Sequence, residues 1–248
     1  MSDLWSICSA PRGVILALAA LLAGMSVATH AAEPPSGISD QPCPAPAAQD
    51  WAGLCKYRAA NAAVLASSTP TRVVFIGDSI TEGWVSADPS LFARGVVGRG
   101  IGGQTTPQML VRFRADVVAL HPKVVHLLAG TNDIAGNTGP SSLQDYQNNI
   151  MSMVEIAQAN GIDVIVGSIP PAAAFPWRRQ IDPLPRIAEM NAWLRDYANQ
   201  KKIRFIDYHS ALAGTAAQLR SDLGDDGVHP NRKGYAVMRK LIEAQLPR

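Results

Sequence analysis

Two short stretches of the sequence carry side chains that could perform nucleophilic acyl transfer. The apolar run in VVFIGDSITEGW, residues 73–84, leads directly into a glycine, an aspartate and Ser79. Further along the chain, DGVHP contains Asp226 and His229. Acyl transfer by a serine needs a hydroxyl at a sharp strand exit, a histidine to take its proton and a carboxylate to orient that histidine. These residues therefore indicate a Ser79–His229–Asp226 triad.

Other histidines compete less well for the role of base. His126 lies inside the apolar run VVHLL and is interpreted as a core histidine, while His209 follows the last predicted strand and is a weaker candidate. Asp226 lies three residues before His229, so one short turn lets the carboxylate contact Nδ1 while Nε2 points toward Ser79. The alternative for Ser79 is an ordinary turn serine, and for the DGVHP pair a surface turn that caps the last helix.

The oxyanion of such a reaction needs hydrogen-bond donors, usually backbone amides and a side-chain amide. Gly103 in GRGIGGQTT permits close approach of its N–H, and Asn132 in AGTNDIAGNTG offers a side-chain NH₂. The N–H of Ser79 is a third candidate. Asp133 is interpreted as a turn residue rather than a catalytic one.

These loops need a scaffold that brings them to one edge, and the strand pattern supplies it. Apolar runs predict five strands, separated by stretches with helical spacing, at residues 72–76, 95–97, 123–128, 162–168 and 203–206. Alternating strands and helices indicate an α/β fold with a parallel sheet covered on both faces. In such sheets the ligand site lies outside the carboxyl ends of the strands.

Three helices have clear sequence signals. Ser141 or Ser142 is expected to cap a helix that Gly161 ends. A second apolar stripe covers residues 184–197, and Asn231 is expected to cap the last helix. The core residues expected on that last helix are Tyr235, Met238, Leu241 and Ile242.

The N-terminal part has the composition of an export signal. Arg12 precedes the apolar run at residues 14–28, and small residues follow it. A spanning helix needs roughly twenty apolar residues, so the shorter run favours a cleaved signal peptide over an uncleaved anchor. We therefore expect a signal peptide at residues 1–31, a Pro-rich arm at 32–49 and a hydrolase domain at 50–248. The mature protein is expected to be secreted or periplasmic, with no stable membrane anchor.

Cys43 and Cys55 are the two cysteines that remain after signal cleavage. In an oxidising compartment such a pair favours a disulfide, which would hold the arm against the domain. Two buried thiols remain the alternative. A zinc site is disfavoured because no matching Cys or His pair accompanies them.

Net charge and motif spacing argue against two other classes of function, nucleic-acid binding and dinucleotide binding. The formal charge of the 248 residues is +2, without the basic stripe that nucleic-acid binding needs. Gly98, Gly100 and Gly103 spell the dinucleotide fingerprint G-x-G-x-x-G, which requires an acidic residue about twenty positions on. Asp116 comes too early and within a predicted helix. We therefore disfavour a nucleotide cofactor.

The segments FIGDSITEGW, GIGGQTT, AGTND and DGVHPNRKGY resemble, in order, the four blocks of the SGNH, or GDSL, hydrolase superfamily. The resemblance implies a three-layer α/β/α sandwich, flavodoxin-like, with a five-stranded parallel sheet and no cofactor or metal. It implies Ser79 as nucleophile, His229 as base and Asp226 as its orienting residue, with Gly103 and Asn132 as oxyanion donors. One departure is Gly98, where the family often has asparagine.

We expect a secreted serine esterase acting on short-chain acyl esters, acetyl esters first, with a small-molecule or carbohydrate alcohol. A thioesterase or lysophospholipase of the same superfamily and a non-catalytic carbohydrate-binding module remain alternatives. Trp84 and Trp177 are candidates for lining the substrate pocket. A histidine base must be neutral to act, so activity is expected to fall in acid. The sequence makes no prediction of oligomeric state.

Overall fold

Five short strands form one sheet in the computed structural model, which describes residues 50–247. Every strand pairing is parallel, and the strand order is β2-β1-β3-β4-β5. The strands are β1 Val73–Gly77, β2 Val96–Gly100, β3 Val124–Leu128, β4 Asp163–Gly167 and β5 Arg204–Ile206. Each lies where the apolar runs predicted a strand. This order is the flavodoxin-like one, in which the chain reverses its winding direction between β1 and β3.

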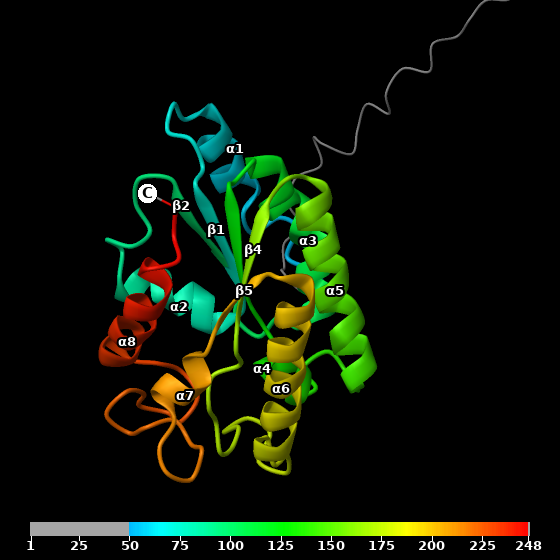
Figure 1. The fold of residues 1–248 in the computed structure, drawn as a ribbon, viewed down its shortest axis with the longest axis vertical. Helices are drawn as coiled ribbons and strands as arrows, with labels where there is room; N and C mark the ends of the chain where they lie inside the picture. The colour runs from blue at the N-terminus through cyan, green and yellow to red at the C-terminus, as the bar shows by residue number, and fades with distance from the viewer. Residues whose placement is uncertain (1–49, 248) are drawn as a thin grey trace, which may run out of the picture. The chain divides into compact units, whose positions relative to one another are not determined.

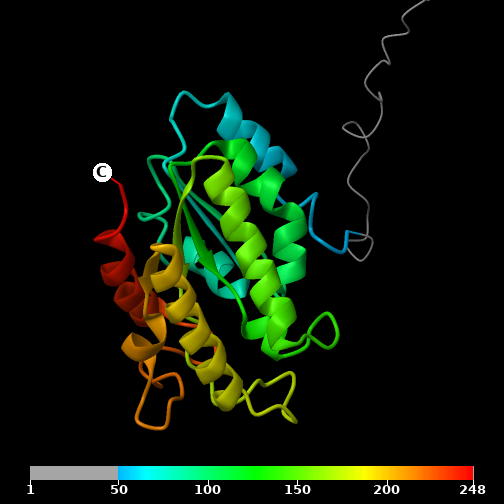
Figure 2. The same cartoon turned by 45° about the vertical axis from the view of Figure 1, so that its right-hand side comes forward.

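Helices cover both faces of the sheet, so the predicted three-layer α/β/α sandwich is confirmed (Figures 1 and 2). One face carries α3, α5 and α6, and the other carries α2, α7 and α8. The helices are α1 Arg58–Ala66, α2 Ser79–Ala87, α3 Thr106–Asp116, α4 Thr131–Ile134, α5 Leu143–Ala159, α6 Leu184–Lys201, α7 Tyr208–Leu212 and α8 Arg232–Glu243. A short 3₁₀ turn, Val118–Leu120, follows α3.

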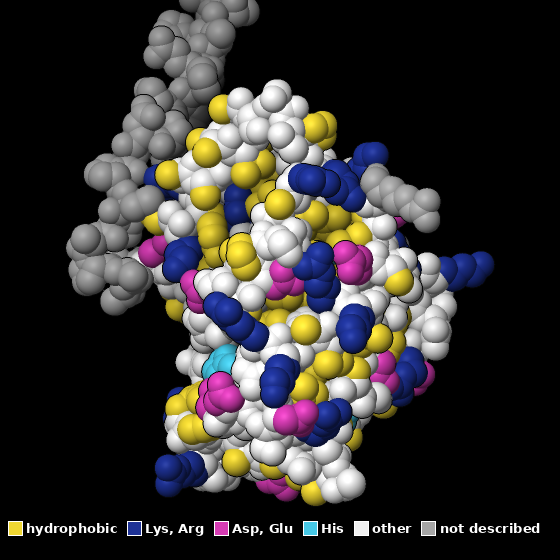
Figure 3. Space-filling view, turned by 90° about the vertical axis from the view of Figure 1, so that its left-hand side faces the viewer, with side chains coloured by type: hydrophobic (Ala, Val, Ile, Leu, Met, Phe, Trp, Pro, Cys, Tyr) yellow, Lys and Arg dark blue, Asp and Glu magenta, His cyan; other side chains and the backbone are white. Residues whose placement is uncertain are grey.

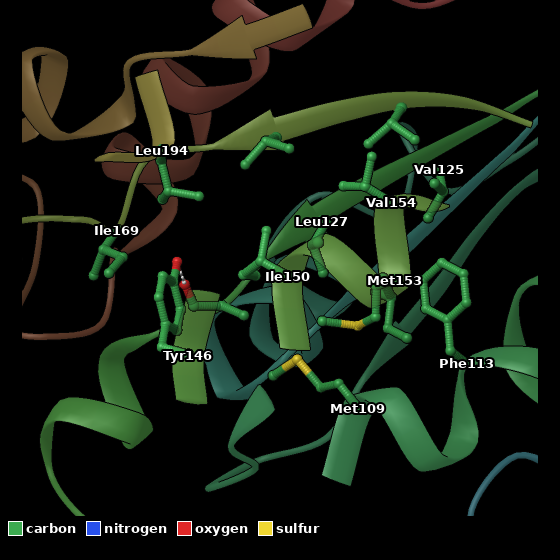
Figure 4. Packing of buried hydrophobic residues seen from close by; sticks show 14 of the residues in the cluster. Met109, Phe113, Val125, Leu127, Tyr146, Ile150, Met153, Val154, Ile169 and Leu194 are labelled. Carbon is green, nitrogen blue, oxygen red and sulfur yellow. Dashed lines mark hydrogen bonds between the residues drawn. The ribbon is translucent and has the colours of Figure 1, made fainter. Parts of the chain in front are cut away.

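Two hydrophobic cores lie on the two sides of the sheet because alternate strand residues point to opposite faces. Val74 and Ile76 of β1 belong to one core, and Val73 and Phe75 belong to the other. Figure 4 shows the first core, in which side chains of α3 and α5 pack over β3. The continuous apolar character of β1 follows from burial on both faces.

Trp84 belongs to the second core, so its expected role in a substrate pocket is wrong. Its side chain is fully buried on α2, where it makes an edge contact with Phe75 and stacks on Tyr235. His126 lies in the same core, and its Nε2 forms a hydrogen bond with the Tyr208 hydroxyl at 3.0 Å. Burial lowers the pKa of His126 to about 3, so this core histidine is neutral.

The predicted helix ends agree with the structure, with one error among the core residues. Ser142 caps α5 by accepting a hydrogen bond from the Asp145 N–H, and Gly161 adopts the left-handed conformation just after the helix. Asn231 caps α8 as expected. Leu241 was expected in the core but is exposed, because it lies on the outward side of α8.

The predicted signal peptide, the arm at residues 32–49 and Cys43 lie outside the described residues. The bridge between Cys43 and Cys55 therefore stays a prediction. Within residues 50–247, no helix has the length and apolar content to cross a membrane.

On the face that carries α2, α7 and α8, basic and acidic side chains are interspersed (Figure 3).

Candidate active site

The turn from β1 into α2 presents Ser79 at the carboxyl edge of the sheet. Ser79 is the first residue of α2, and Asp78 caps the helix by accepting a hydrogen bond from the Ile80 N–H at 2.9 Å. Gly77 makes the turn tight, because a Cβ there would lie 2.1 Å from the Thr81 hydroxyl oxygen. The backbone N–H of Ser79 is one of those that a helix start leaves without an intrahelical acceptor.

Ser79, His229 and Asp226 form a continuous hydrogen-bonded chain. The Ser79 Oγ lies 2.9 Å from His229 Nε2, and His229 Nδ1 lies 2.5 Å from Asp226 Oδ2. An ionised carboxylate only accepts, so Nδ1 carries the ring proton and the Nε2 lone pair faces the Ser79 hydroxyl. Residues 150 positions apart thus meet in the arrangement that general-base activation of a serine requires.

Asp226 is held in place by its own turn. Its Oδ1 accepts the backbone N–H groups of Val228 and His229, at 2.9 and 2.7 Å, while Oδ2 contacts the ring. Burial acts to raise the pKa of Asp226, but the hydrogen bonds from His229 and Val228 outweigh it and hold the pKa below its ordinary value. The carboxylate is therefore ionised at neutral pH.

Gly103 and Asn132 lie on the two loops that flank Ser79. Gly103 follows β2 and adopts a left-handed φ of +76°, which favours glycine. A Cβ added to Gly102, the preceding residue, would lie 3.8 Å from the Ser79 Cβ, so this loop runs beside the serine. Asn132 follows β3, and its Nδ2 donates to Asp78 Oδ2 at 3.3 Å and to the Gln104 carbonyl at 3.1 Å. The residues predicted as oxyanion donors thus lie on adjoining loops at the carboxyl ends of β2, β1 and β3, and Asn132 contacts the other two loops.

Asp78 is a buried carboxylate directly beside this site. Burial raises the pKa of Asp78 to about 6, although the Ile80 N–H and the charge of a protonated His229 act in the opposite direction. Asp133 is also buried, with a raised pKa, and accepts hydrogen bonds from the backbone and hydroxyl of Thr106. It lies within α4 and anchors the start of α3, a role that differs from the turn residue expected from the sequence.

Asn137 and Trp177 complete the rim. Asn137 Nδ2 donates to Asn132 Oδ1 at 2.7 Å and to the Gly103 carbonyl at 3.2 Å, while Trp177 Nε1 donates to Asn137 Oδ1 at 3.1 Å. The partly exposed Trp177 ring has its centroid 6.3 Å from that of His229. The Trp177 ring therefore lies near His229, and its contact with substrate stays a prediction. Sequence reasoning missed Asn137, although it is a second asparagine within the same glycine-rich segment as Asn132.

Arg112 is a buried support that the sequence did not reveal. Its guanidinium donates to the carbonyls of Gly77 and Arg99, at 3.0 and 2.8 Å, near the carboxyl ends of β1 and β2. It also donates to Gln104 Oε1 and pairs with Asp116, at 2.6 and 3.0 Å. One side chain thus fixes the strand ends from which the Ser79 and Gly103 loops begin.

The glycine pattern resembling a dinucleotide fingerprint has a packing role. Gly98 and Gly100 lie within β2 itself, and a Cβ on Gly100 would lie 2.1 Å from the Glu82 backbone nitrogen. These glycines let α2 approach the sheet closely. The same tight packing accounts for Gly98, because a Cβ there would lie 2.3 Å from a methyl of Val85.

An open pocket of about 510 Å³ adjoins the Gly103 loop. Its wall includes Trp51 and Lys56 from the start of the described chain, together with Asn137 and Thr138. Lys56 pairs with Glu82 at 3.0 Å, and the Glu82 carboxylate accepts the Gly102 N–H at 2.8 Å.

Residues 50–247 contain no group of three or more His, Cys, Asp or Glu side chains that could hold a metal ion.

Comparisons with known proteins identify the family and the fold. The sequence profile of the GDSL-like Lipase/Acylhydrolase family matches residues 75–237. The crystal structure of a GDSL-like lipase from Bacteroides thetaiotaomicron is 44% identical, with 78% of this chain and 97% of that chain covered and a TM-score of 0.74. A candidate acylhydrolase from Bacteroides fragilis is 48% identical, with 79% and 96% covered and a TM-score of 0.75.

Two other similar proteins match this chain at lower sequence identity or over a shorter length. An acetyl xylan esterase from Geobacillus stearothermophilus is 20% identical, with 71% of this chain and 94% of that chain covered and a TM-score of 0.58, so it shares the fold. The uncharacterized lipoprotein YqeF of Bacillus subtilis is 35% identical over 74 residues, 29% of this chain, and the match spans only 30% of that protein's length.

The fold and the comparisons define an ester hydrolase. The chain belongs to the GDSL-like lipase/acylhydrolase family, within the SGNH hydrolase superfamily.

Proposed function

We propose that this protein hydrolyses short-chain acyl esters, acetyl esters first, through Ser79, His229 and Asp226. The observation that carries the proposal is the hydrogen-bonded chain from Ser79 Oγ to His229 Nε2 and from His229 Nδ1 to Asp226. Its geometry suits proton removal from the hydroxyl during attack.

The reaction proceeds in two halves. Ser79 Oγ attacks the ester carbonyl carbon as its proton passes to His229 Nε2, and the N–H groups of Ser79 and Gly103 and the Nδ2 of Asn132 donate to the oxyanion. The tetrahedral intermediate collapses, the carbon–oxygen bond to the alcohol breaks, and His229 gives its proton to the leaving oxygen. Water then attacks the acyl-enzyme with His229 as base, releasing the carboxylic acid and restoring Ser79.

The surroundings of His229 favour a bulky, polar alcohol such as a sugar. The leaving oxygen receives its proton from Nε2, so the alcohol portion lies on the side of the site where Trp177 is partly exposed. An indole face held at a fixed angle by stacking on Phe175 offers a sugar ring a flat apolar surface. We therefore propose a carbohydrate O-acetyl ester as the substrate class.

The first experiment compares the full chain with its Ser79→Ala variant on p-nitrophenyl esters from acetate to palmitate. We expect turnover that is highest on acetate and is lost in Ser79→Ala. Ser86→Ala, an exposed serine on the same helix, is the matched control and should retain full activity. Activity that survives in Ser79→Ala would refute the proposed nucleophile.

The second experiment tests the alcohol portion with acetylated xylan and other acetylated glycans. Trp177→Ala should raise KM for the glycan more than for p-nitrophenyl acetate, because the small ester does not need the stacking surface. Equal effects on the two substrates would contradict sugar stacking. Binding of glycans without any turnover would favour the carbohydrate-binding alternative.

We also propose that the protein is exported, on the basis of the signal-like sequence at residues 1–31. The partial similarity to a lipoprotein agrees with export. Mass spectrometry of the protein from its host should find a chain that begins near residue 32, with a mass decrease of two hydrogens if Cys43 and Cys55 are bridged.

A further inference from the structure

The Trp177 indole N–H, which can only donate, and the Gly103 carbonyl, which can only accept, set the orientation of the Asn137 side-chain amide. The indole Nε1–H of Trp177 has no lone pair to offer, so the atom of Asn137 that faces it must be the oxygen Oδ1. The Asn137 NH₂ then points the other way. It donates to Asn132 Oδ1 at 2.7 Å and to the Gly103 carbonyl at 3.2 Å.

The same logic fixes the next amide. Because Asn132 Oδ1 accepts from Asn137, the Asn132 NH₂ must point toward Asp78, the residue before the nucleophile. A rotated Asn132 would direct its oxygen at the site instead, and an oxygen cannot donate to an oxyanion. The direction of Asn132 is therefore fixed from both sides, because Asn137 donates to its Oδ1 while the Gln104 carbonyl and the Asp78 carboxylate accept from its NH₂.

Asn137 also restrains the loop that carries the second donor. Gly103 has a left-handed φ, and its carbonyl accepts from Asn137, which fixes the peptide after the donor N–H. On the other side, the Gly102 N–H donates to Glu82. The loop is thus held before and after the Gly103 N–H, and Asn137 contacts both predicted oxyanion donors at once.

We propose that Asn137 is a positioning residue that aligns the two oxyanion donors Asn132 and Gly103, and that the Trp177 N–H holds the Asn137 oxygen on the opposite side from these donors. This inference rests on the proposed serine mechanism. It assigns Trp177 a second role, separate from any stacking of substrate on its ring.

The test uses Asn137→Asp, which keeps the size and the acceptor for Trp177 but removes the NH₂. A carboxylate oxygen then faces Asn132 Oδ1 and the Gly103 carbonyl, so both donors lose their alignment. We expect kcat on p-nitrophenyl acetate to fall by about 10²–10³-fold, the range for loss of an oxyanion donor. KM should stay within about twofold. Asn148→Asp on the exposed surface of α5 makes the same change while keeping its bond to Gln144, and should leave kcat unchanged.

Trp177→Phe keeps a smaller aromatic ring that can stack on Phe175 and removes the indole N–H. We expect kcat to fall by about tenfold with KM unchanged, which a role limited to stacking would not produce. This variant carries the test if Asn137→Asp lowers the melting temperature.

A double-mutant cycle separates a positioning role from an independent one. In an Asn132→Ala background, Asn137→Asp should cost about tenfold or less, because its main target is gone. A full, multiplicative loss in that background would overturn the proposal. A raised KM with unchanged kcat would also overturn it, since Asn137 would then contact substrate directly.

The two proposals fail in different ways. If Ser79→Ala abolishes turnover while Asn137→Asp and Trp177→Phe keep wild-type kcat, the serine mechanism stands and the positioning role is wrong. If the wild-type chain hydrolyses no ester, the positioning role falls together with the mechanism on which it rests.

Discussion

Asp78 is a carboxyl group that the fold buries beside the candidate nucleophile, and replacing it with asparagine should stabilise the protein above neutral pH. Asparagine keeps an oxygen that can accept the Ile80 N–H, so the cap of α2 survives. What the substitution removes is a buried charge. Asp133 and His229 are the titratable groups that act on this charge, and the substitution leaves both in place.

The magnitude follows from the pKa. Burial raises the pKa of Asp78 from 3.8 to about 6, which corresponds to about 3 kcal/mol between the folded and unfolded states. Because the folded pKa is the higher one, the stability that Asp78 contributes is fully present below about pH 4. It is lost as the pH rises through about 6, where the folded state must bury an ionised carboxylate.

Urea unfolding of the wild-type protein and Asp78→Asn at pH 4, 6 and 8 measures this effect. The difference in unfolding free energy between the two proteins should move by about 2.4 kcal/mol in favour of the variant from pH 4 to pH 8, because at pH 4 the unfolded carboxyl is already partly ionised. The variant should also lose about 1 kcal/mol of unfolding free energy at every pH, because its NH₂ would face the Asn132 NH₂. Asp163→Asn, at the opposite end of the sheet and 80% exposed, is the control.

A difference that stays constant from pH 4 to pH 8 would refute the burial argument. The same variant should lower kcat, because two facing NH₂ groups turn Asn132 away from the position that the mechanism requires. A protein that gains stability at pH 8 and loses activity would show that the buried charge is retained for the site at the expense of the fold.

Three further substitutions test separate parts of the structure. Asp226→Asn should lower kcat by about 10⁴-fold with little change in KM, as for a triad whose histidine takes the wrong tautomer, and steady-state kinetics measure it. Trp84→Ala should cost about 3–5 kcal/mol in urea unfolding, with KM unchanged in the protein that remains folded, since a raised KM would restore its pocket role. Gly100→Ala should destabilise by about 4 kcal/mol, because its Cβ would lie 2.1 Å from the Glu82 nitrogen, and an unchanged melting temperature would contradict the close packing of α2.

The fold was accessible from the sequence because parallel strands buried on both faces leave an unmistakable pattern. β1 is apolar throughout and leads into a glycine, and the strands alternate with long helical stripes such as residues 184–197. The Asp226–His229 contact was also accessible, since it depends on a turn of three residues.

Trp84 shows where sequence reasoning went wrong. It lies five residues after Ser79 on one helix, which turns its side chain about 140° away from the serine. As an aromatic residue close to Ser79 in the sequence it was a candidate for lining the pocket, but the helix directs it into the core against Tyr235. Leu241 on α8 shows the opposite error, because it was expected in the core and is exposed.

By itself the sequence determined the set of helices and strands, the parallel arrangement of the strands and the residues at the strand ends whose side chains can perform acyl transfer. Only the tertiary structure decided which amides face one another across loops. Asn137, Arg112 and Trp177 act through hydrogen bonds between segments far apart in the chain, and such contacts leave no period or local spacing in the sequence. Local patterns record burial and turns, whereas the direction of an amide depends on the partner that the fold brings to it.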